Sequence, residues 1–321
     1  MSKPGLFAQE LEKGRPIVLD GGLATELEAQ GAVLHDSLWS AALLHSDPEA
    51  IVKAHLAYLE AGATCIISAS YQATRHGLMT LGISASEADA LIVRSVELAR
   101  EARRRFLAEY PATGRPILIA ASVGPYGAAL HDGSEYFGAY GVSKADLREF
   151  HAHRLELLDG SGADILACET IPDCQEAAVL CELLRTTTTP AWVSFSCKDA
   201  KHISDGTPIR ECATLFRDHP TVLAVGVNCT PPQFIASLIG ELRESLSDKA
   251  IVVYPNSGER YEATSNTWHE TSHETSHDPS TPVECGLAAQ EWLRAGARII
   301  GGCCRMGPRH IHQMHERLAA H

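Results

Sequence analysis

The sequence lacks the features that identify several large classes of protein. It contains no run of about 18 apolar residues, which a membrane-spanning helix needs. Residues 1–15 are polar and lack the apolar core of a secretory signal. There is no dense block of lysine and arginine, and the formal net charge is −13, so we expect neither a nucleic-acid nor a membrane partner. These absences favour a cytoplasmic protein that acts on small molecules.

The chain also lacks a segment rich in proline, glycine or serine that would divide it into domains. Its 321 residues, 45% of them hydrophobic, suffice for one large core, so we expect a single domain over residues 1–321. No glycine-rich nucleotide-binding loop follows the first apolar run, because the stretch Asp20–Ala24 does not have the required pattern. In a reducing compartment the ten cysteines are thiols or metal ligands rather than a disulfide framework.

Eight short apolar runs recur along the chain, each rich in valine, isoleucine, leucine or alanine. Nearly continuous apolar runs of this length are typical of strands that are buried on both faces. The predicted strands are Pro16–Asp20, Ala63–Ala69, Pro116–Val123, Ala163–Cys168, Ala191–Ser196, Val222–Asn228, Ile251–Tyr254 and Ala297–Gly301.

Longer amphipathic stretches separate these runs, and several begin at or near a proline, as the first turn of a helix allows. The predicted helices are Pro48–Ala61, Ser86–Tyr110 with Ser86 as its cap, Lys144–Gly160, Asp173–Arg185, Pro208–Asp218, Pro232–Leu246, Pro282–Ala295 and Pro308–Ala320. Eight strand–helix units in a chain of this length predict a (β/α)8 TIM barrel. An open, doubly wound α/β sheet is the main alternative.

Cysteines follow two of the predicted strands, at the ends where a barrel places its active site. Cys229 comes after the sixth strand, and Cys303 and Cys304 come after the eighth. In a closed barrel only one strand separates the sixth strand from the eighth, so the three thiols converge near the mouth of the barrel. Three thiolates with an open fourth position suit a catalytic Zn²⁺ whose substrate is itself a thiol. Buried free cysteines are also common packing residues, so the spacing alone leaves both interpretations open.

A histidine-rich insert at residues 262–281 contains two matches to the pattern His-Glu-x-x-His, at His269–His273 and His273–His277. That pattern binds zinc in proteases only on a helix that packs against a core. The flanking residues are almost all polar, so we interpret the insert as a solvated loop. Its role does not follow from the sequence.

Ten stretches spread over nearly the whole chain resemble the homocysteine S-methyltransferases, and most closely the branch that uses S-methylmethionine as methyl donor. They are Asp20–Gly22, Ala24–Glu28, Leu38–Ala41, Ser68–Thr74, Ser122–Gly127, Asp132–Tyr136, Cys168–Pro172, Val227–Cys229, Tyr254–Glu259 and Gly301–Cys304. The resemblance implies a barrel fold, bound zinc, and methyl transfer to homocysteine that gives methionine.

The resemblance also implies roles for individual residues. The positions that match the metal ligands of the family are Cys229, Cys303 and Cys304. Asp20 and Glu169 match residues that hold the amino-acid end of homocysteine, and Trp39 and Tyr71 fall near the donor pocket. The chain departs from the family pattern at Arg75–His76, where a proline is expected, and in the insert after Glu259. Both departures lie away from the metal ligands and bear on the pocket rim and the choice of donor.

Alternatives stay open at this point. Betaine is the donor of a related branch, and S-adenosylmethionine is a weaker candidate donor than S-methylmethionine. A barrel that keeps zinc only for structure or thiol sensing would need a fourth protein ligand. A zinc-free lyase that acts on a phosphorylated sugar would need a phosphate-binding glycine loop, but two cysteines follow Gly301–Gly302 directly. The oligomeric state does not follow from the sequence.

Overall fold

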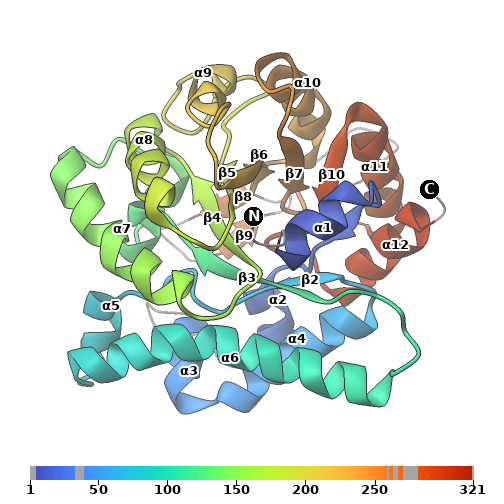
Figure 1. The fold of residues 1–321 in the computed structure, drawn as a ribbon, viewed down its shortest axis with the longest axis horizontal. Helices are drawn as coiled ribbons and strands as arrows, with labels where there is room; N and C mark the ends of the chain where they lie inside the picture. The colour runs from blue at the N-terminus through green and yellow to red at the C-terminus, as the bar shows by residue number, and fades with distance from the viewer. Residues whose placement is uncertain (1–4, 33–39, 259, 263–266, 270–280, 320–321) are drawn as a thin grey trace.

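Eight parallel strands form the centre of the molecule, with helices around them (Figure 1). The computed structural model describes residues 5–32, 40–258, 260–262, 267–269 and 281–319. The barrel strands are β1 (Ile17–Val18), β2 (Cys65–Ile67), β3 (Leu118–Val123), β4 (Ile165–Ile171), β5 (Ala191–Phe195), β6 (Val222–Asn228), β7 (Ala250–Tyr254) and β10 (Ala297–Ile300). Each of them lies within or overlaps one of the eight predicted runs.

The order of the strands closes the sheet. Strands β2 to β7 pair with their neighbours in chain order, and β10 pairs with β7 on one side and β1 on the other. A bridge between Leu19 and Cys65 joins β1 to β2. The protein is therefore a (β/α)8 barrel and not an open doubly wound sheet, which has two unpaired edges.

Helices surround the strands in the order expected from the alternation. The α-helices are α1 (Leu6–Glu12), α2 (Leu23–Ala29), α3 (Ser40–Ser46), α4 (Pro48–Glu60), α5 (Arg75–Met79), α6 (Ala85–Glu109), α7 (Lys144–Asp159), α8 (Cys174–Leu183), α9 (Ile209–Thr214), α10 (Ile235–Ser245), α11 (Pro282–Ala295) and α12 (Pro308–Leu318). Short 3-10 helices are η1 (Tyr126–Ala129), η2 (Ser134–Tyr136), η3 (Leu184–Thr186) and η4 (Pro232–Phe234). No helix among the described residues is long and apolar enough to cross a membrane.

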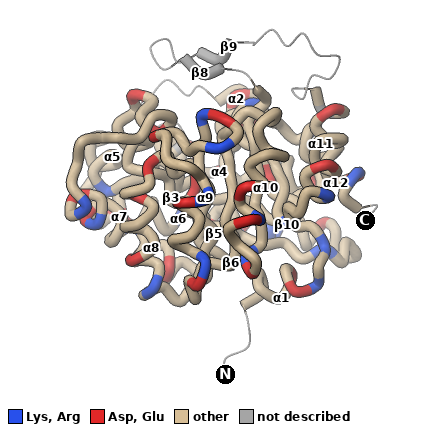
Figure 2. Tube along the Cα trace, turned by 90° about the horizontal axis from the view of Figure 1, so that it is seen from above, with Lys and Arg blue, Asp and Glu red and all other residues tan. Residues whose placement is uncertain are grey.

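The core has two layers because each strand is buried on both faces. The larger layer lies between the strands and the helices. The smaller one fills the barrel and includes Trp192, Tyr254 and Phe7 from α1. The Phe7 ring lies 5.9 Å from that of Trp192, so α1 covers one end of the barrel. Figure 2 shows α1 and α2 at opposite ends of the molecule, and α2 marks the end where the strands terminate.

Several details differ from the prediction. The cap of α6 is Ser84, whose hydroxyl accepts a hydrogen bond from Glu87 N, and not Ser86. Helix α9 ends at Thr214, four residues earlier than predicted, because the chain then continues in tight turns. The helices α1, α2, α3 and α5 were not predicted, nor was the antiparallel pair of β8 (Arg260–Glu262) with β9 (Thr267–His269). The rest of the histidine-rich insert, residues 263–266 and 270–280, lies outside the described residues.

Candidate active site

A cavity of about 220 Å³ opens where the barrel strands end. The loops after seven of the eight strands, or the last residues of those strands, contribute to its wall. The predicted site residues that line it are Asp20, Tyr71, Glu169, Cys229, Cys303 and Cys304. The remaining candidate, Trp39, lies outside the described residues.

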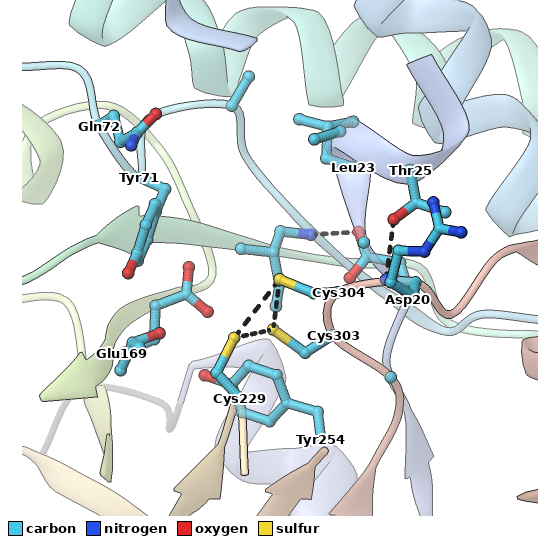
Figure 3. Close-up of a pocket in the computed structure, with 18 of the residues that line it drawn as sticks. Asp20, Leu23, Thr25, Tyr71, Gln72, Glu169, Cys229, Tyr254, Cys303 and Cys304 are labelled. Carbon is cyan, nitrogen blue, oxygen red and sulfur yellow. Dashed lines mark hydrogen bonds between the residues drawn. The ribbon is translucent and has the colours of Figure 1, made fainter. Parts of the chain in front are cut away.

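The three cysteine sulfurs lie together in this cavity (Figure 3). Cys229 Sγ is 2.7 Å from Cys303 Sγ and 3.6 Å from Cys304 Sγ, and the last two sulfurs are 4.0 Å apart. Thiolates at 2.3 Å from a tetrahedral Zn²⁺ would be about 3.8 Å apart, close to two of these distances. All three cysteines are free thiols. The soft donors and their spacing therefore fit a zinc ion.

The backbone around the thiols is held in conformations that ordinary residues seldom adopt. Cys229 has a φ of 46°, and Thr170 at the end of β4 has a φ of 61°. Asn228 connects the two, because its Oδ1 accepts from Thr170 N at 2.7 Å and its Nδ2 donates to Thr170 Oγ1 at 2.7 Å. Strained backbone of this kind persists only where its surroundings hold it, and it concentrates at functional sites.

Close packing also orients the loop that carries Cys303 and Cys304. A Cβ at Gly301 would lie 2.4 Å from Leu19 Cβ, so only glycine lets β10 and the end of β1 approach this closely. On the far side of the loop the Tyr58 hydroxyl donates to Gly22 O at 2.8 Å and to Met306 O at 3.2 Å. The adjacent cysteines are thus presented to Cys229 by a rigid support.

The thiols share hydrogen bonds, and their acidities diverge. The pKa of Cys304 falls well below its usual range because Cys229 and Cys303 donate to its sulfur, with a further contribution from the Tyr136 hydroxyl. The same contacts raise the pKa of Cys229, since its proton is held between the sulfurs. These contacts favour the thiolate form of Cys304, and thiolates are the form that binds zinc.

Asp20 lies in the loop after β1 and is buried. Its Oδ2 accepts from Ile67 N at 2.8 Å, while its Oδ1 has no hydrogen-bond partner. Burial, together with the charge of Glu169, raises the pKa of Asp20 well above its usual range. A buried carboxylate oxygen without a partner is costly, so this atom is suited to a donor group brought by a ligand.

Glu169 lies near the end of β4 and is also buried. Ser122 Oγ donates to its carboxylate, and Tyr254 is a second partner. Tyr254 is itself held by Ser194 Oγ at 2.7 Å and by Trp192 Nε1 at 3.0 Å. Burial raises the pKa of Glu169 to about 7. The carboxyl group is thus poised between its neutral and ionised forms near physiological pH.

Tyr71 follows β2 and is partly buried in the cavity wall. In Figure 3 it lies beside Glu169, whereas Asp20 lies on the other side of the thiols. Its backbone is held close to the loop after β3, because a Cβ at Gly124 would lie 2.4 Å from Tyr71 O. An aromatic face in this position is suited to a cationic group.

The structure adds residues that the sequence reasoning did not single out. Glu135 and Tyr136 of η2 line the cavity, although they come from the long insert between β3 and α7. They belong to the stretch Asp132–Tyr136, which was noted only as a family match. No periodic pattern places this insert over the barrel, so the motif was the only available signal.

Known proteins similar to this chain share both its sequence and its fold. The model of the homocysteine S-methyltransferase family matches residues 17–318. Homocysteine S-methyltransferase YbgG of Bacillus subtilis is 49% identical over 301 residues, which cover 93% of each protein. Homocysteine S-methyltransferase of Escherichia coli is 47% identical over 323 residues, covering 99% of this chain and 100% of that protein.

A solved structure extends the comparison to three dimensions. The homocysteine methyltransferase MmuM of Escherichia coli, in its metallated form, matches with a TM-score of 0.84 at 42% identity. The match covers 96% of this chain and 99% of that one. All eight barrel strands lie inside the residues that the family model matches.

Proposed function

This chain belongs to the homocysteine S-methyltransferase family, and from that premise we propose that it transfers the methyl group of S-methylmethionine to homocysteine with the help of zinc. The products would be two molecules of methionine. Methyl transfer to homocysteine is the activity of the family, whereas the donor, the metal and the residue roles are our inference. S-adenosylmethionine is proposed as a second donor.

The convergence of three thiols with buried carboxylates in one cavity carries the proposal. Among the described residues the group of possible metal ligands contains three side chains, Cys229, Cys303 and Cys304. Three ligands leave one position for a substrate, as in catalytic zinc sites, whereas structural sites are closed by a fourth. This favours the catalytic interpretation over a structural or thiol-sensing zinc site.

Zinc held by these cysteines would lower the pKa of the homocysteine thiol, so that the thiolate is available at neutral pH. The thiolate sulfur attacks the methyl carbon of the donor in line with the leaving sulfur. A new S–C bond forms, the old one breaks, and its electron pair neutralises the sulfonium. Both reacting sulfurs lose their charge, so a site that excludes water favours the reaction. No proton transfer is needed in this step.

Asp20 and Glu169 would bind the ammonium group of homocysteine. Their carboxylates are buried, burial raises the pKa of both, and the charge of Glu169 adds to the cost of ionising Asp20, so a cation between them would relieve this cost. Tyr71 would face the donor cation, and such a contact is worth about 0.5–2 kcal/mol. The residues thereby position both substrates, which is a large part of the rate enhancement in reactions of two molecules.

The ten cysteines of this protein are all free in the structure. A metal site made of three thiols needs a reducing compartment, and we propose on that ground that the enzyme acts in the cytoplasm.

The test is an assay of the purified, reduced and zinc-loaded protein with homocysteine and each of S-methylmethionine, S-adenosylmethionine and betaine. We expect methionine to form fastest with S-methylmethionine. Cys229→Ser should lose both bound zinc and activity. Cys174→Ser is the matched control, because Cys174 is a half-buried thiol on α8 outside the cluster. Zinc-loaded protein that turns over none of the three donors would contradict the proposal, and a higher rate with betaine would contradict the choice of donor.

A further inference from the structure

A second buried carboxylate without a partner faces the same cavity. Glu135 is 9% exposed, and its Oε2 has no hydrogen-bond partner. The other such carboxylate oxygen in the cavity wall is Oδ1 of Asp20, which is assigned above to homocysteine. The reaction brings together two amino acids, and each carries one ammonium group. The cavity thus offers one orphaned carboxylate oxygen for each ammonium.

The two carboxylates belong to different parts of the wall. Asp20 and Glu169 act on each other, since the charge of Glu169 adds to burial in raising the pKa of Asp20. The charge of Glu135 adds to burial in raising the pKa of Tyr71, more than the charge of Glu169 does, and Glu135 is next to Tyr136, whose side chain contacts Cys304. Glu135 therefore shares a subsite with the two tyrosines on the side proposed for the donor.

We propose that Glu135 binds the ammonium group of the methyl donor and selects an amino-acid sulfonium over a donor that lacks this group. The inference rests on the proposed function, because it assigns a subsite for its second substrate. A carboxylate is the natural partner of an ammonium, and the pairing satisfies an oxygen that is otherwise buried without a hydrogen bond.

The chemistry of the methyl transfer favours the ammonium group of the donor, and not its sulfonium, as the partner of the Glu135 carboxylate. The sulfonium loses its charge as the methyl group leaves, so a carboxylate against it would stabilise the substrate more than the transition state. The ammonium keeps its charge throughout. A carboxylate there binds both states alike and positions the donor at no cost to the chemical step.

The backbone of Glu135 is fixed in a way that suits a binding role. Ser196 Oγ, at the end of β5, donates to Glu135 O at 3.1 Å, and Ser204 Oγ lies 2.8 Å from Ser196 Oγ. A Cβ at Gly127 would lie 2.6 Å from Glu135 N, so η1 packs directly on η2. No described side chain neutralises the carboxylate, and burial raises its pKa to about 7. A purely structural glutamate would have been expected to use both oxygens.

The experiment compares two sulfonium ligands, of which one carries an ammonium group. S-methylmethionine carries it, and dimethylsulfonioacetate does not. Binding of each to the zinc-loaded protein is measured by calorimetry, together with KM for S-methylmethionine and for homocysteine. Glu135→Gln is the test variant, Glu135→Asp retains the charge, and Glu149→Gln is the matched control, since Glu149 is an exposed glutamate on α7 that does not line the cavity.

Loss of a hydrogen bond to a charged group costs about 1.5–3 kcal/mol, so Glu135→Gln should weaken S-methylmethionine binding roughly 10- to 100-fold. Its affinity for dimethylsulfonioacetate and its KM for homocysteine should stay near the wild-type values. Glu135→Asp should recover part of the loss, and Glu149→Gln should behave as the wild type. The melting temperature of each variant is recorded, so that a folding defect is recognised as one.

An unchanged affinity for S-methylmethionine in Glu135→Gln overturns the inference and leaves the proposed function standing. Equal losses for the two sulfonium ligands also overturn it, because the carboxylate would then act on the sulfonium or on the fold. A comparable rise in KM for homocysteine would place Glu135 in the other subsite. Wild-type protein that neither binds nor turns over S-methylmethionine refutes the proposed function itself, and the donor subsite with it.

Discussion

Replacing Glu169 with glutamine should remove a specific dependence of ligand binding on pH. The carboxyl group is buried and its pKa is raised to about 7, against 4.5 in the unfolded chain. The ionised form, which an ammonium needs, therefore predominates only above pH 7. Binding should be weak at pH 6 and tighten as the pH rises. Methionine is the appropriate ligand, because it has the ammonium of homocysteine but no thiol that titrates on the metal.

The size of the effect follows from the pKa. With a pKa of about 7, roughly one carboxyl in eleven is ionised at pH 6 and ten in eleven at pH 8, which is about a tenfold change in affinity or ~1.4 kcal/mol. Glu169→Gln should bind methionine roughly 10- to 100-fold more weakly at pH 8, and it should lose the part of the pH dependence that the Glu169 carboxyl causes. Ser122→Ala removes the hydrogen bond that lowers this pKa, so its binding curve should shift to higher pH.

The variant Glu169→Gln should also be more stable than the wild type. The folded-state pKa is raised, so the proton favours the folded state between pH 4.5 and 7, and this stability is lost as the pH rises through 7. Glutamine does not ionise and avoids the cost of a buried charge. The free energy of unfolding of Glu169→Gln at pH 8 should therefore exceed that of the wild type by up to about 3 kcal/mol. Denaturant unfolding at pH 5 and pH 8 measures it.

Calorimetric titrations of methionine from pH 6 to pH 8 test the binding argument. A wild-type dissociation constant that is flat over this range would refute the raised pKa. If the affinity of Glu169→Gln for methionine changed with pH as steeply as that of the wild type, another group would be responsible for the pH dependence.

Three further predictions concern buried residues of the barrel and of the helices around it. His55 is buried with neither ring nitrogen hydrogen-bonded, and burial lowers its pKa to about 4. The free energy of unfolding of the wild type should thus fall by up to about 3 kcal/mol as the pH falls from 6.5 to 4. His55→Leu should resist denaturant better than the wild type, with a larger difference at pH 5 than at pH 7. A destabilised variant would contradict this. In Gly226→Ala the new Cβ would lie 1.7 Å from Val252 O, so β6 and β7 must move apart at a cost in stability of about 3 kcal/mol or more. The melting temperature should therefore fall. An unchanged melting temperature would show that the strands adapt freely. Tyr58→Phe removes a hydroxyl that hydrogen-bonds to two loops of the site. The change should lower the free energy of unfolding by about 1–2 kcal/mol and speed the loss of zinc to a chelator. Zinc retention equal to that of the wild type would show that the hydroxyl does not support the site.

Much of the barrel could be predicted because its strands are buried on both faces. Runs such as Val222–Asn228 and Ala191–Phe195 contain one polar residue each and are otherwise made of apolar residues and glycine, and this pattern is local to the run. Helix ends were less predictable. Ser84 and Ser86 are equally good caps by residue type, and the structure selects Ser84 because its hydroxyl reaches Glu87 N. The short helices α1 and α5 have too few turns to show a period.

For the site, the position of the cysteines at strand ends was readable because all strands of a parallel barrel end on the same side. Sequence also located Asp20, Glu169 and Tyr71, with the help of the family pattern. It could not assign Glu135, since a residue in an irregular insert has no register that relates it to the strands. It also could not reveal Thr170, Asn228 and Cys229 as one unit, because their hydrogen bonds join positions 58 residues apart.

The sequence by itself determined the alternation of strands and helices, the order of the units, and the residue types available at the strand ends. These depend on local hydrophobic patterns and on the direction of the chain. Only the tertiary structure decided which carboxylate oxygens lack a partner, which pKa values are raised, and how far apart the sulfurs lie. Those properties depend on burial and on contacts between distant segments, and they arise only when the barrel has closed.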